Sequence, residues 1–193
     1  GSDDFLVGGA GTDQLDGGAG VDTADYSDAV TGVEASLTSG EANNDGHGSV
    51  DILIGLENII GSDSADLLDG SAAANRLAGG AGGDRLRGAG GDDVLVGGAG
   101  SDTIEGGDGL DAADYSGGAG PVVIDLAAGT ADDSLGGIDT LSSIEVVIGS
   151  AFNDQITGSA AAERFVAGAG SDTIHGGGGE DTLDYRNTIN TII

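Results

Sequence analysis

The sequence predicts an all-β solenoid, in which short strands stack in coils and two β-rich inserts separate blocks of coils. Three observations predict it. Glycine recurs with a period of nine residues, a carboxylate recurs at position six of that period, and an apolar residue recurs at position eight. A period of nine fits neither an α-helix nor a long strand.

The repeats fall into three blocks, which we expect to form one continuous solenoid. The first block, residues 1–25, contains GGAGTDQLD and GGAGVDTAD. The second, residues 61–114, consists of six units without a gap: GSDSADLLD, GSAAANRLA, GGAGGDRLR, GAGGDDVLV, GGAGSDTIE and GGDGLDAAD. The third block is residues 149–186, and residues 187–193 form a tail.

The two inserts, residues 26–60 and 115–148, are copies of each other. Val33 and Leu37 in the first lie 89 residues before Val122 and Leu126 in the second. Later in each insert, an Asp and a Glu (Asp51 and Glu57, Asp139 and Glu145) are 88 residues apart between copies. Each insert is close to two coils long, and residues 33–37 and 122–126 are its strand candidates.

Within one unit, the glycine-rich hexapeptide predicts a turn, because glycine adopts positive φ readily. The other three residues, such as 94–96, predict a short strand whose middle residue points inward. Two units make one coil of 18 residues with a strand on each side. Residues 18 apart, such as Asp84 and Asp102, then lie on the same edge of adjacent coils.

Composition excludes several classes of function. The chain has 34 acidic and 5 basic residues and a net charge of −29, so nucleic acid and anionic membranes should repel it. No run approaches the roughly 18 apolar residues of a membrane span. The chain has no Cys and no HExxH, GxSxG or P-loop motif, so we expect a module without catalytic activity. It begins Gly1-Ser2 without Met, and we expect a fragment of a longer protein.

Carboxylates stacked from coil to coil repel one another and call for a counterion. The turns offer many hard oxygen ligands on flexible glycine segments, which suits Ca²⁺ better than Mg²⁺. Zn²⁺ would require His or Cys ligands.

The units GGAGTDQLD, GGAGVDTAD, GGAGGDRLR and GGAGSDTIE resemble the GGxGxDxUx nonapeptide of the RTX (repeats-in-toxin), or hemolysin-type, calcium-binding family. The resemblance implies a parallel β-roll in which Ca²⁺ lies between turns of successive coils. It implies carboxylate ligands at Asp4, Asp13, Asp22, Asp66, Asp84, Asp93, Asp102, Asp111, Asp154, Asp172 and Asp181. It also implies carbonyl ligands at Gly9, Gly11, Gly18, Gly20, Gly80, Gly82, Gly98, Gly100, Gly107, Gly109, Gly168, Gly170, Gly177 and Gly179.

Pairing each unit with the next but one gives about seven Ca²⁺ ions, to which the inserts could add or subtract one. Two units depart from the pattern, because Asn75 and Glu163 replace Asp at position six. Residues 43–46 resemble part of an EF-hand loop, but Ile52 stands where a ligating Glu belongs. We expect a polar loop there, with an extra Ca²⁺ site as the alternative.

Other conspicuous side chains have structural interpretations. His47 and His175 are expected to be exposed and without a role, and the five Arg are expected to pair with surface Asp. The tyrosines that end the blocks (Tyr26, Tyr115 and Tyr185) are expected to cap the narrow core, with a sugar-stacking platform as the alternative.

The family resemblance implies a module that folds on binding Ca²⁺ outside the cell, after type I secretion from a Gram-negative bacterium. Its partners would be calcium ions, covalently attached domains of a parent protein and the secretion machinery. Within the parent protein it would assist secretion and folding or act as a spacer. The alternative is a polysaccharide-binding accessory module of an enzyme such as an alginate epimerase; a lyase or epimerase activity of the chain itself has no candidate site.

Overall fold

The computed structural model describes residues 1–185, which form two sheets and contain no helix. The nine-stranded sheet has the order β1 (Phe5–Leu6), β3 (Thr23–Asp25), β7 (Asn58–Ile60), β9 (Arg76–Gly82), β11 (Val94–Gly100), β13 (Ala112–Asp114), β17 (Val146–Ile148), β19 (Arg164–Val166) and β21 (Thr182–Asp184). The twelve-stranded sheet has the order β2 (Gln14–Asp16), β6 (Asp51–Ile54), β5 (Glu41–Asn44), β4 (Glu34–Ser36), β8 (Leu67–Asp69), β10 (Arg85–Gly90), β12 (Thr103–Asp108), β16 (Ile138–Ser142), β15 (Thr130–Asp132), β14 (Val123–Asp125), β18 (Gln155–Thr157) and β20 (Thr173–His175).

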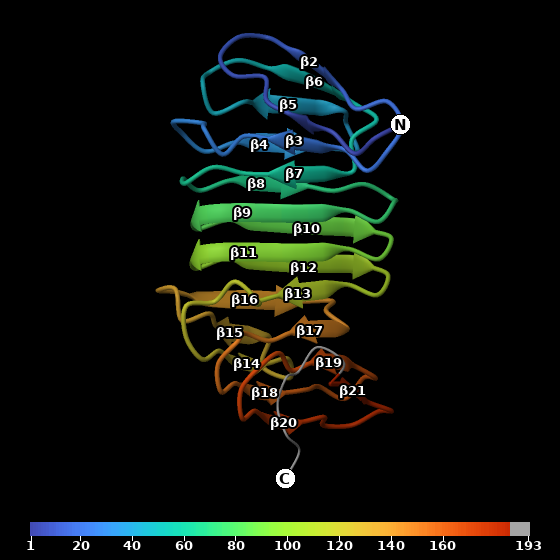
Figure 1. Cartoon of the computed structure of the whole chain (residues 1–193), viewed down its shortest axis with the longest axis vertical. Coiled ribbons are helices and arrows are strands. Elements are labelled where there is room, and N and C mark those ends of the chain that lie inside the picture. The colour runs from blue at the N-terminus through green and yellow to red at the C-terminus, as the bar shows by residue number, and fades with distance from the viewer. Residues whose placement is uncertain (186–193) are drawn as a thin grey trace.

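The repeat blocks form the predicted parallel solenoid, with the strands stacked as rungs along the long axis (Figure 1). The chain passes from one sheet to the other after every strand of a block. In the second block Arg85 pairs with Thr103, and Arg76 with Val94, both 18 residues further on. One coil is therefore two nonapeptides, as the spacing predicted.

Position eight forms the core. Leu68, Leu77, Leu86 and Leu95 are fully buried, and Ile104 is 1% exposed. The flanking positions seven and nine are more exposed, because neighbouring residues of a strand point to opposite faces. Only one apolar side chain per strand therefore fills the space between the sheets in this block.

The four central strands of the second block, β9–β12, are longer than the three residues expected. β9 and β11 each run for seven residues, and Gly80 and Gly82 in the turn pair with Gly98 and Gly100. Glycine makes this close approach possible: a Cβ built on Gly100 would lie 1.5 Å from the carbonyl oxygen of Gly82. The ladder consequently continues into the turns.

The inserts differ from the two-coil expectation. In the nine-stranded sheet β3 pairs directly with β7, and β13 with β17, so each insert accounts for one coil. Its additional residues form an antiparallel meander in the other sheet: β4, β5 and β6 in the first insert, and β14, β15 and β16 in the second. The predicted strands 33–37 and 122–126 are shorter in the structure, where β4 and β14 have three residues each.

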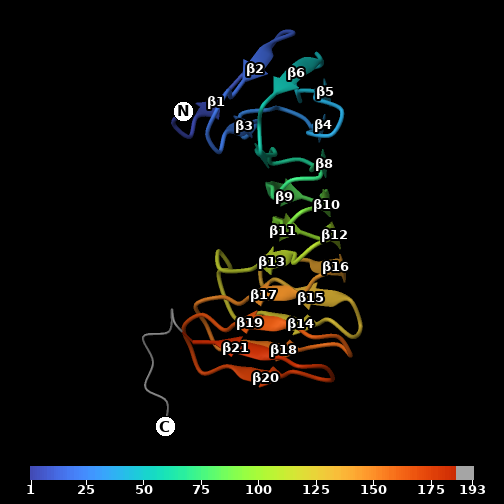
Figure 2. The ribbon, with the colours of Figure 1, turned by 90° about the vertical axis from the view of Figure 1, so that its right-hand side faces the viewer.

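Each meander lengthens one sheet more than the other. At an insert the twelve-stranded sheet gains two strands beyond those of its partner, or about 10 Å at the usual strand spacing. The nine-stranded sheet lacks this extra length, so the stack is uneven there. Figure 2 shows that the strand direction changes along the stack: β9–β12 are seen nearly end-on, whereas β17–β21 run across the view.

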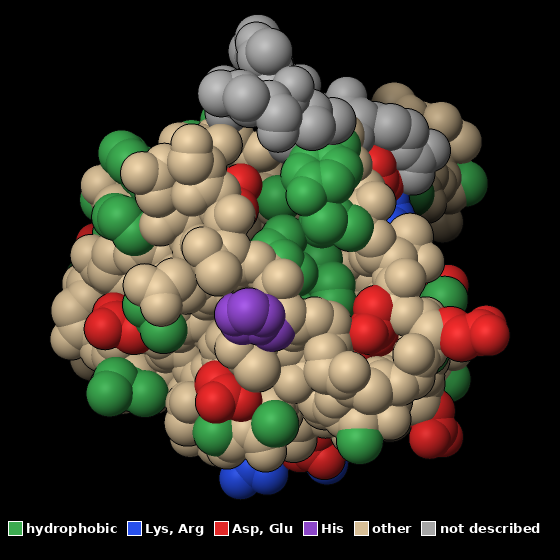
Figure 3. All heavy atoms as spheres, turned by 90° about the horizontal axis from the view of Figure 1, so that it is seen from below, with side chains coloured by type: hydrophobic (Ala, Val, Ile, Leu, Met, Phe, Trp, Pro, Cys, Tyr) green, Lys and Arg blue, Asp and Glu red, His purple; other side chains and the backbone are tan. Residues whose placement is uncertain are grey.

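The C-terminal end of the described stack is less well covered than its middle. Leu183 is 38% exposed and Ile174 is half-buried, whereas Ile156 and Phe165 one coil earlier are buried. Figure 3 shows hydrophobic side chains reaching the surface at this end. The predicted tail 187–193, and Arg186, lie outside the described residues.

Candidate metal sites

The glycine-rich turns share one backbone conformation. Eight of them have positive φ at both position two and position four. The position-two residues are Gly9, Gly18, Gly80, Ala89, Gly98, Gly107, Gly168 and Gly177. The position-four residues of the same turns are Gly11, Gly20, Gly82, Gly91, Gly100, Gly109, Gly170 and Gly179. All fourteen glycines predicted as carbonyl ligands belong to this set.

Carbonyl oxygens of these turns point toward the next coil. A Cβ built on Gly98 would lie 1.9 Å from the carbonyl oxygen of Gly80, one coil earlier. A Cβ built on Gly79 would lie 2.3 Å from Asp84 Oδ2 and 2.6 Å from the carbonyl oxygen of Gly97. A carboxylate and carbonyls of two successive turns therefore face the same gap.

The position-six carboxylates are held by a hydrogen bond along the stack. The main-chain N–H of one position-six residue donates to a carboxylate oxygen of the corresponding residue in the next coil, at 2.7–3.1 Å. Asp22, Asp66, Asp84, Asp93, Asp102, Asp111 and Asp154 are at most 5% exposed. Position six is thus a structural link before any ion is considered.

These links run along two separate edges. On the edge where the chain enters the twelve-stranded sheet, the second block contributes Asp66, Asp84 and Asp102. On the opposite edge it contributes Asn75, Asp93 and Asp111. Each edge therefore carries its own column of carboxylates.

The second carboxylate oxygen is buried and without a hydrogen-bond partner in most turns that begin Gly-Gly, and in the turn that begins Gly88-Ala89. It is orphaned in Asp13, Asp22, Asp84, Asp93, Asp102 and Asp111. A buried charged oxygen without a partner is strongly unfavourable. These oxygens face the same gaps as the turn carbonyls, so the donor set fits a hard cation such as Ca²⁺, which takes six to eight oxygen ligands.

Burial raises the pKa values of the stacked carboxyls. The pKa of Asp84 rises to about 7, mainly by loss of hydration and further by the charges of Asp102, Asp66 and Asp139. Burial likewise raises the pKa of Asp93 to about 6, and it raises those of Asp102, Asp111 and Asp172. The metal-free column therefore favours protonation.

Turns that begin Gly-Ser behave differently. Ser62 donates its main-chain N–H to Asp66 Oδ2 at 2.6 Å and its hydroxyl to Asp66 Oδ1 at 2.8 Å. Ser150 makes the same two bonds to Asp154. Serine thus satisfies both carboxylate oxygens from within the turn, and neither Asp66 nor Asp154 has an orphaned oxygen.

The two departing units also begin with Gly-Ser. The side-chain oxygen of Asn75 accepts from Ser71, and its amide donates to the carbonyl oxygen of Glu57 at 2.8 Å. Ser159 donates to Glu163 Oε1, while Glu163 Oε2 remains buried and unpartnered. Asn75 is therefore satisfied without a metal, whereas Glu163 keeps one free oxygen.

The remaining predicted carboxylates lie toward the ends of the described stack. Asp4 and Asp181 are exposed, and Asp172 is half-buried. The first coil and the last described coil thus surround their carboxylates less completely than the middle ones do.

Four carboxylates of the inserts extend the two columns, and the sequence analysis did not assign them this role. Asp51 accepts from the N–H of Asp13, and Asp139 from that of Asp102. Glu57 and Glu145 accept from the N–H groups of Asp22 and Asp111. Their matching positions in the two inserts were the available signal. At Glu57 and Glu145 the turn before the strand has three residues (55–57 or 143–145) and not the usual six. The longer Glu side chain still reaches the N–H of the position-six residue in the preceding coil.

Three further expectations have structural outcomes. His47 is half-buried with an unpartnered Nδ1, so its predicted exposure is wrong, while His175 is exposed. His47 lies beside Asp45, a buried insert residue whose hydrogen bonds tie the surrounding loop together. Tyr26 and Tyr115 are buried, as a cap requires, whereas Tyr185 is 47% exposed. Ion pairs join Arg76 to Asp114, Arg87 to Asp69, and Arg164 to Asp184.

No group of three or more Asp, Glu or His side chains within residues 1–185 could hold a metal ion by itself. Backbone carbonyls must therefore supply much of the coordination, as the turn geometry allows. The described residues also contain no helix with the length and hydrophobicity that crossing a membrane requires.

A parallel roll with stacked oxygen-lined turns defines a class of calcium-binding repeat proteins. The profile of the RTX calcium-binding nonapeptide repeat matches residues 1–25, 53–86, 78–113, 87–120, 139–162 and 157–192. These matches cover more than half of the chain, which therefore belongs to this family. A search of the curated proteins found no match.

Proposed function

We propose that the chain is a module that folds when Ca²⁺ binds outside the cell, as part of a larger secreted protein. The observation that supports this most directly is the pair of buried carboxylate columns with orphaned oxygens. Columns of this kind are unfavourable in a metal-free fold and favourable once a cation is shared between coils.

The net charge supports the same coupling. The chain carries −29, and about seven divalent ions would offset roughly half of it. The apolar core is narrow, so little hydrophobic burial is available to oppose the repulsion. Bound Ca²⁺ supplies positive charge and oxygen coordination between successive turns. Because the ions bind the folded state and not the dispersed chain, they shift the equilibrium toward folding.

The described residues support a structural role rather than catalysis. The carboxylates proposed as ligands also accept main-chain hydrogen bonds that tie successive coils together, which supports a structural role. We propose an extracellular location, type I secretion from a Gram-negative bacterium, and a role in secretion and folding or as a spacer in the parent protein.

The decisive experiment is far-UV circular dichroism during a Ca²⁺ titration of EDTA-treated chain, with Mg²⁺ as the matched control. A cooperative gain of β-structure that requires Ca²⁺ is expected. Full β-structure in EDTA, unchanged by Ca²⁺, would contradict the proposal. Calorimetry would then count the ions, for which about seven are expected.

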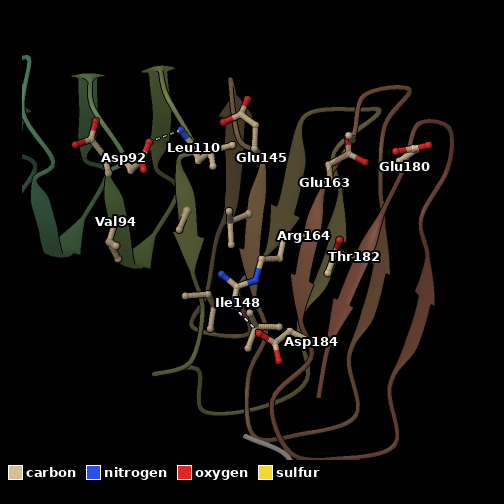
Figure 4. A pocket seen from close by; sticks show the side chains of 15 residues that line it. Asp92, Val94, Leu110, Glu145, Ile148, Glu163, Arg164, Glu180, Thr182 and Asp184 are labelled. Atoms are coloured by element: carbon tan, nitrogen blue, oxygen red, sulfur yellow. Dashed lines mark hydrogen bonds and ion pairs between the residues drawn. The ribbon is translucent and has the colours of Figure 1, made fainter. Parts of the chain in front are cut away.

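One surface feature keeps a carbohydrate-binding role as the second candidate. A groove of about 840 Å³ crosses β11, β13, β17, β19 and β21. Figure 4 shows acidic side chains along it, with Arg164 pointing toward Asp184. The acidic residues that line it are Asp92, Asp93, Glu145, Glu163, Glu180 and Asp184.

This groove favours a neutral or cationic sugar over an anionic one, because its carboxylates would repel a uronate chain. The described residues that line it include no aromatic ring for stacking. Binding of the Ca²⁺-loaded chain to neutral and anionic glycans, with Glu180→Gln as the groove variant, tests the role. Absence of binding to every glycan would remove this candidate.

A further inference from the structure

The segment of each insert that leads back into the solenoid replaces a repeat turn. In the second insert this segment is residues 133–139, which lie against the turn 97–102. A Cβ built on Gly137 would lie 1.6 Å from the carbonyl oxygen of Gly100, much as Gly100 lies against Gly82. The N–H of Asp102 donates to Asp139 Oδ1 at 2.9 Å, which is the link found between repeat turns.

This junction carries two unpartnered carboxylate oxygens on opposite sides. Asp102 Oδ2 comes from the repeat turn and Asp133 Oδ2 from the insert. Asp133 is 1% exposed, and its other oxygen accepts from the N–H of Leu135. The charge of Asp133 helps to raise the pKa of Asp102, after burial itself, so the two carboxyls act on each other.

A buried tyrosine closes the same junction. The hydroxyl of Tyr115 donates to Asp139 Oδ2 at 3.0 Å. Tyr115 and Asp133 line a cavity of about 210 Å³, which Gly98 of the facing turn also lines. This cavity therefore joins an unpartnered carboxylate, a phenol and a positive-φ turn.

The first insert repeats the arrangement independently. Asp13 donates its N–H to Asp51 Oδ1, and the hydroxyl of Tyr26 donates to Asp51 Oδ2. A Cβ built on Gly8 would lie 3.0 Å from Asp51 Oδ2 and 3.4 Å from Asp13 Oδ2, so both oxygens converge over one glycine. Asp45, fully buried, takes the place of Asp133, and its Oδ2 has no partner.

We propose that each insert completes a calcium site of its own at this junction, in addition to the sites between repeat turns. The first site uses Asp13 and Asp51 with the charge of Asp45, and the second uses Asp102 and Asp139 with the charge of Asp133. Carbonyls of the facing glycine turn supply further oxygens. The inference rests on the proposed calcium binding, and it adds insert residues that lie outside the nonapeptides (Asp45, Asp51, Asp133 and Asp139) to the position-six residues Asp13 and Asp102.

The junction sites give the inserts a definite role. Without them, an insert would leave a column of carboxylates with a buried charge at its end. With them, the meander continues the metal column of the preceding block. Each insert contributes three residues to its junction, and the two sets correspond: Tyr26, Asp45 and Asp51 in the first insert, and Tyr115, Asp133 and Asp139 in the second.

The test compares Asp45→Asn/Asp133→Asn with the wild-type chain, and uses Asp28→Asn/Asp132→Asn as the matched control. Asp28 and Asp132 are exposed residues of the same inserts, so the control loses the same charge. Calcium stoichiometry and affinity are measured by calorimetry, and folding by circular dichroism. The double variant should bind two ions about tenfold more weakly, the factor given by a loss of about 1.4 kcal/mol. Values equal to those of the control would overturn the proposal.

Terbium luminescence supplies a second readout. The chain has three Tyr and no Trp, and the two buried Tyr lie at the junctions. Tb³⁺ accepts oxygen ligands as Ca²⁺ does, and tyrosine excites it only at short range. Tyr26→Phe/Tyr115→Phe should keep the number of bound ions while losing most of the tyrosine-sensitised emission.

The two readouts separate the possible failures. Unchanged emission from the Phe variant would overturn the junction sites even if the Asn variant fails to fold. Failure of the wild-type chain to bind Ca²⁺ would instead overturn the proposed function. Binding by wild type with no change in either variant would overturn the junction sites alone.

Discussion

The main-chain N–H of Asp84 donates a 2.8 Å hydrogen bond to Oδ1 of Asp102, the residue 18 positions further along the chain. The same Asp102 leaves its Oδ2 buried and unpartnered. One oxygen thus ties two coils together, while the other remains available to a cation. This division explains why a carboxylate suits position six where a cation is to be bound, whereas Asn75 suits a turn whose polar groups are all satisfied within the protein.

Replacing Asp84 with Asn should change metal-free and metal-bound stability in opposite directions. Asn keeps an acceptor for the N–H of Asp66 but removes a buried charge that Asp102 and Asp66 repel. In EDTA the variant should therefore be more stable than wild type. Its Ca²⁺ affinity at this turn should be about tenfold weaker, equivalent to about 1.4 kcal/mol. Guanidinium unfolding with and without Ca²⁺ measures both, and exposed Asp63→Asn is the control. Equal losses in both conditions would contradict the interpretation.

Acidification should partly replace calcium. The folded chain raises the pKa of Asp84 to about 7 and those of Asp93 and Asp139 to about 6, in each case chiefly through burial. The unfolded carboxyl has a pKa of about 4, so between these values the folded chain binds more protons. The free energy of unfolding in EDTA must then fall as pH rises through this window. Circular dichroism in EDTA should show more β-structure at pH 5 than at pH 7.5, and the reverse order would refute this.

Substituting Gly98 with Ala should destabilise the roll. Gly98 has φ +103°, and an added Cβ would lie 1.9 Å from the carbonyl oxygen of Gly80. Backbone strain of this kind costs about 1–3 kcal/mol, and the clash adds to it. Thermal unfolding at fixed Ca²⁺ is the measurement. Gly117→Ala is the control, since nothing lies within 4 Å of its added Cβ. Equal melting temperatures for the two variants would show that the turn adapts.

Ser62→Ala should weaken folding without removing an ion. The hydroxyl of Ser62 donates to Asp66 at 2.8 Å, and a hydrogen bond to a charged group contributes about 1.5–3 kcal/mol. Unfolding at saturating Ca²⁺ should reveal a loss of this size, with unchanged ion stoichiometry. Exposed Ser27→Ala, which retains its N–H bond to Asp25, is the control. A loss of one bound ion would mean that the Gly-Ser turn coordinates calcium after all.

The period of nine was sufficient to predict the coil, the inward position eight and the column of position-six residues. Each follows from local geometry repeated at a fixed spacing, and Leu86 paired between Leu68 and Ile104 is an example. The structure of the inserts was harder to predict, because their antiparallel meanders depend on strand pairings that no repeat spacing specifies. Neither Asp133 nor Asp45 carries a repeat signature, so their burial was visible only in the folded chain.

The sequence alone also could not predict that the second carboxylate oxygen is unpartnered in Gly-Gly turns but hydrogen-bonded in Gly-Ser turns. Both kinds fit the period, and both place a carboxylate or its substitute at position six. Whether the second oxygen is free depends on the donor groups of Ser62 or Ser150 inside the turn. The backbone at position two decides this, since those serines lack the positive φ of Gly80.

The ladder hydrogen bonds between coils run along the stack, and this orientation has a mechanical consequence. A force that pulls the two ends of the stack apart would load and break these hydrogen bonds one coil at a time, and not all together. Each repeat coil of 18 residues would release about 60 Å of chain, and an insert coil of 35 residues about twice as much. Extension should therefore proceed in small even steps punctuated by long ones, and each step would expose the carboxylates that its bound ions had shielded.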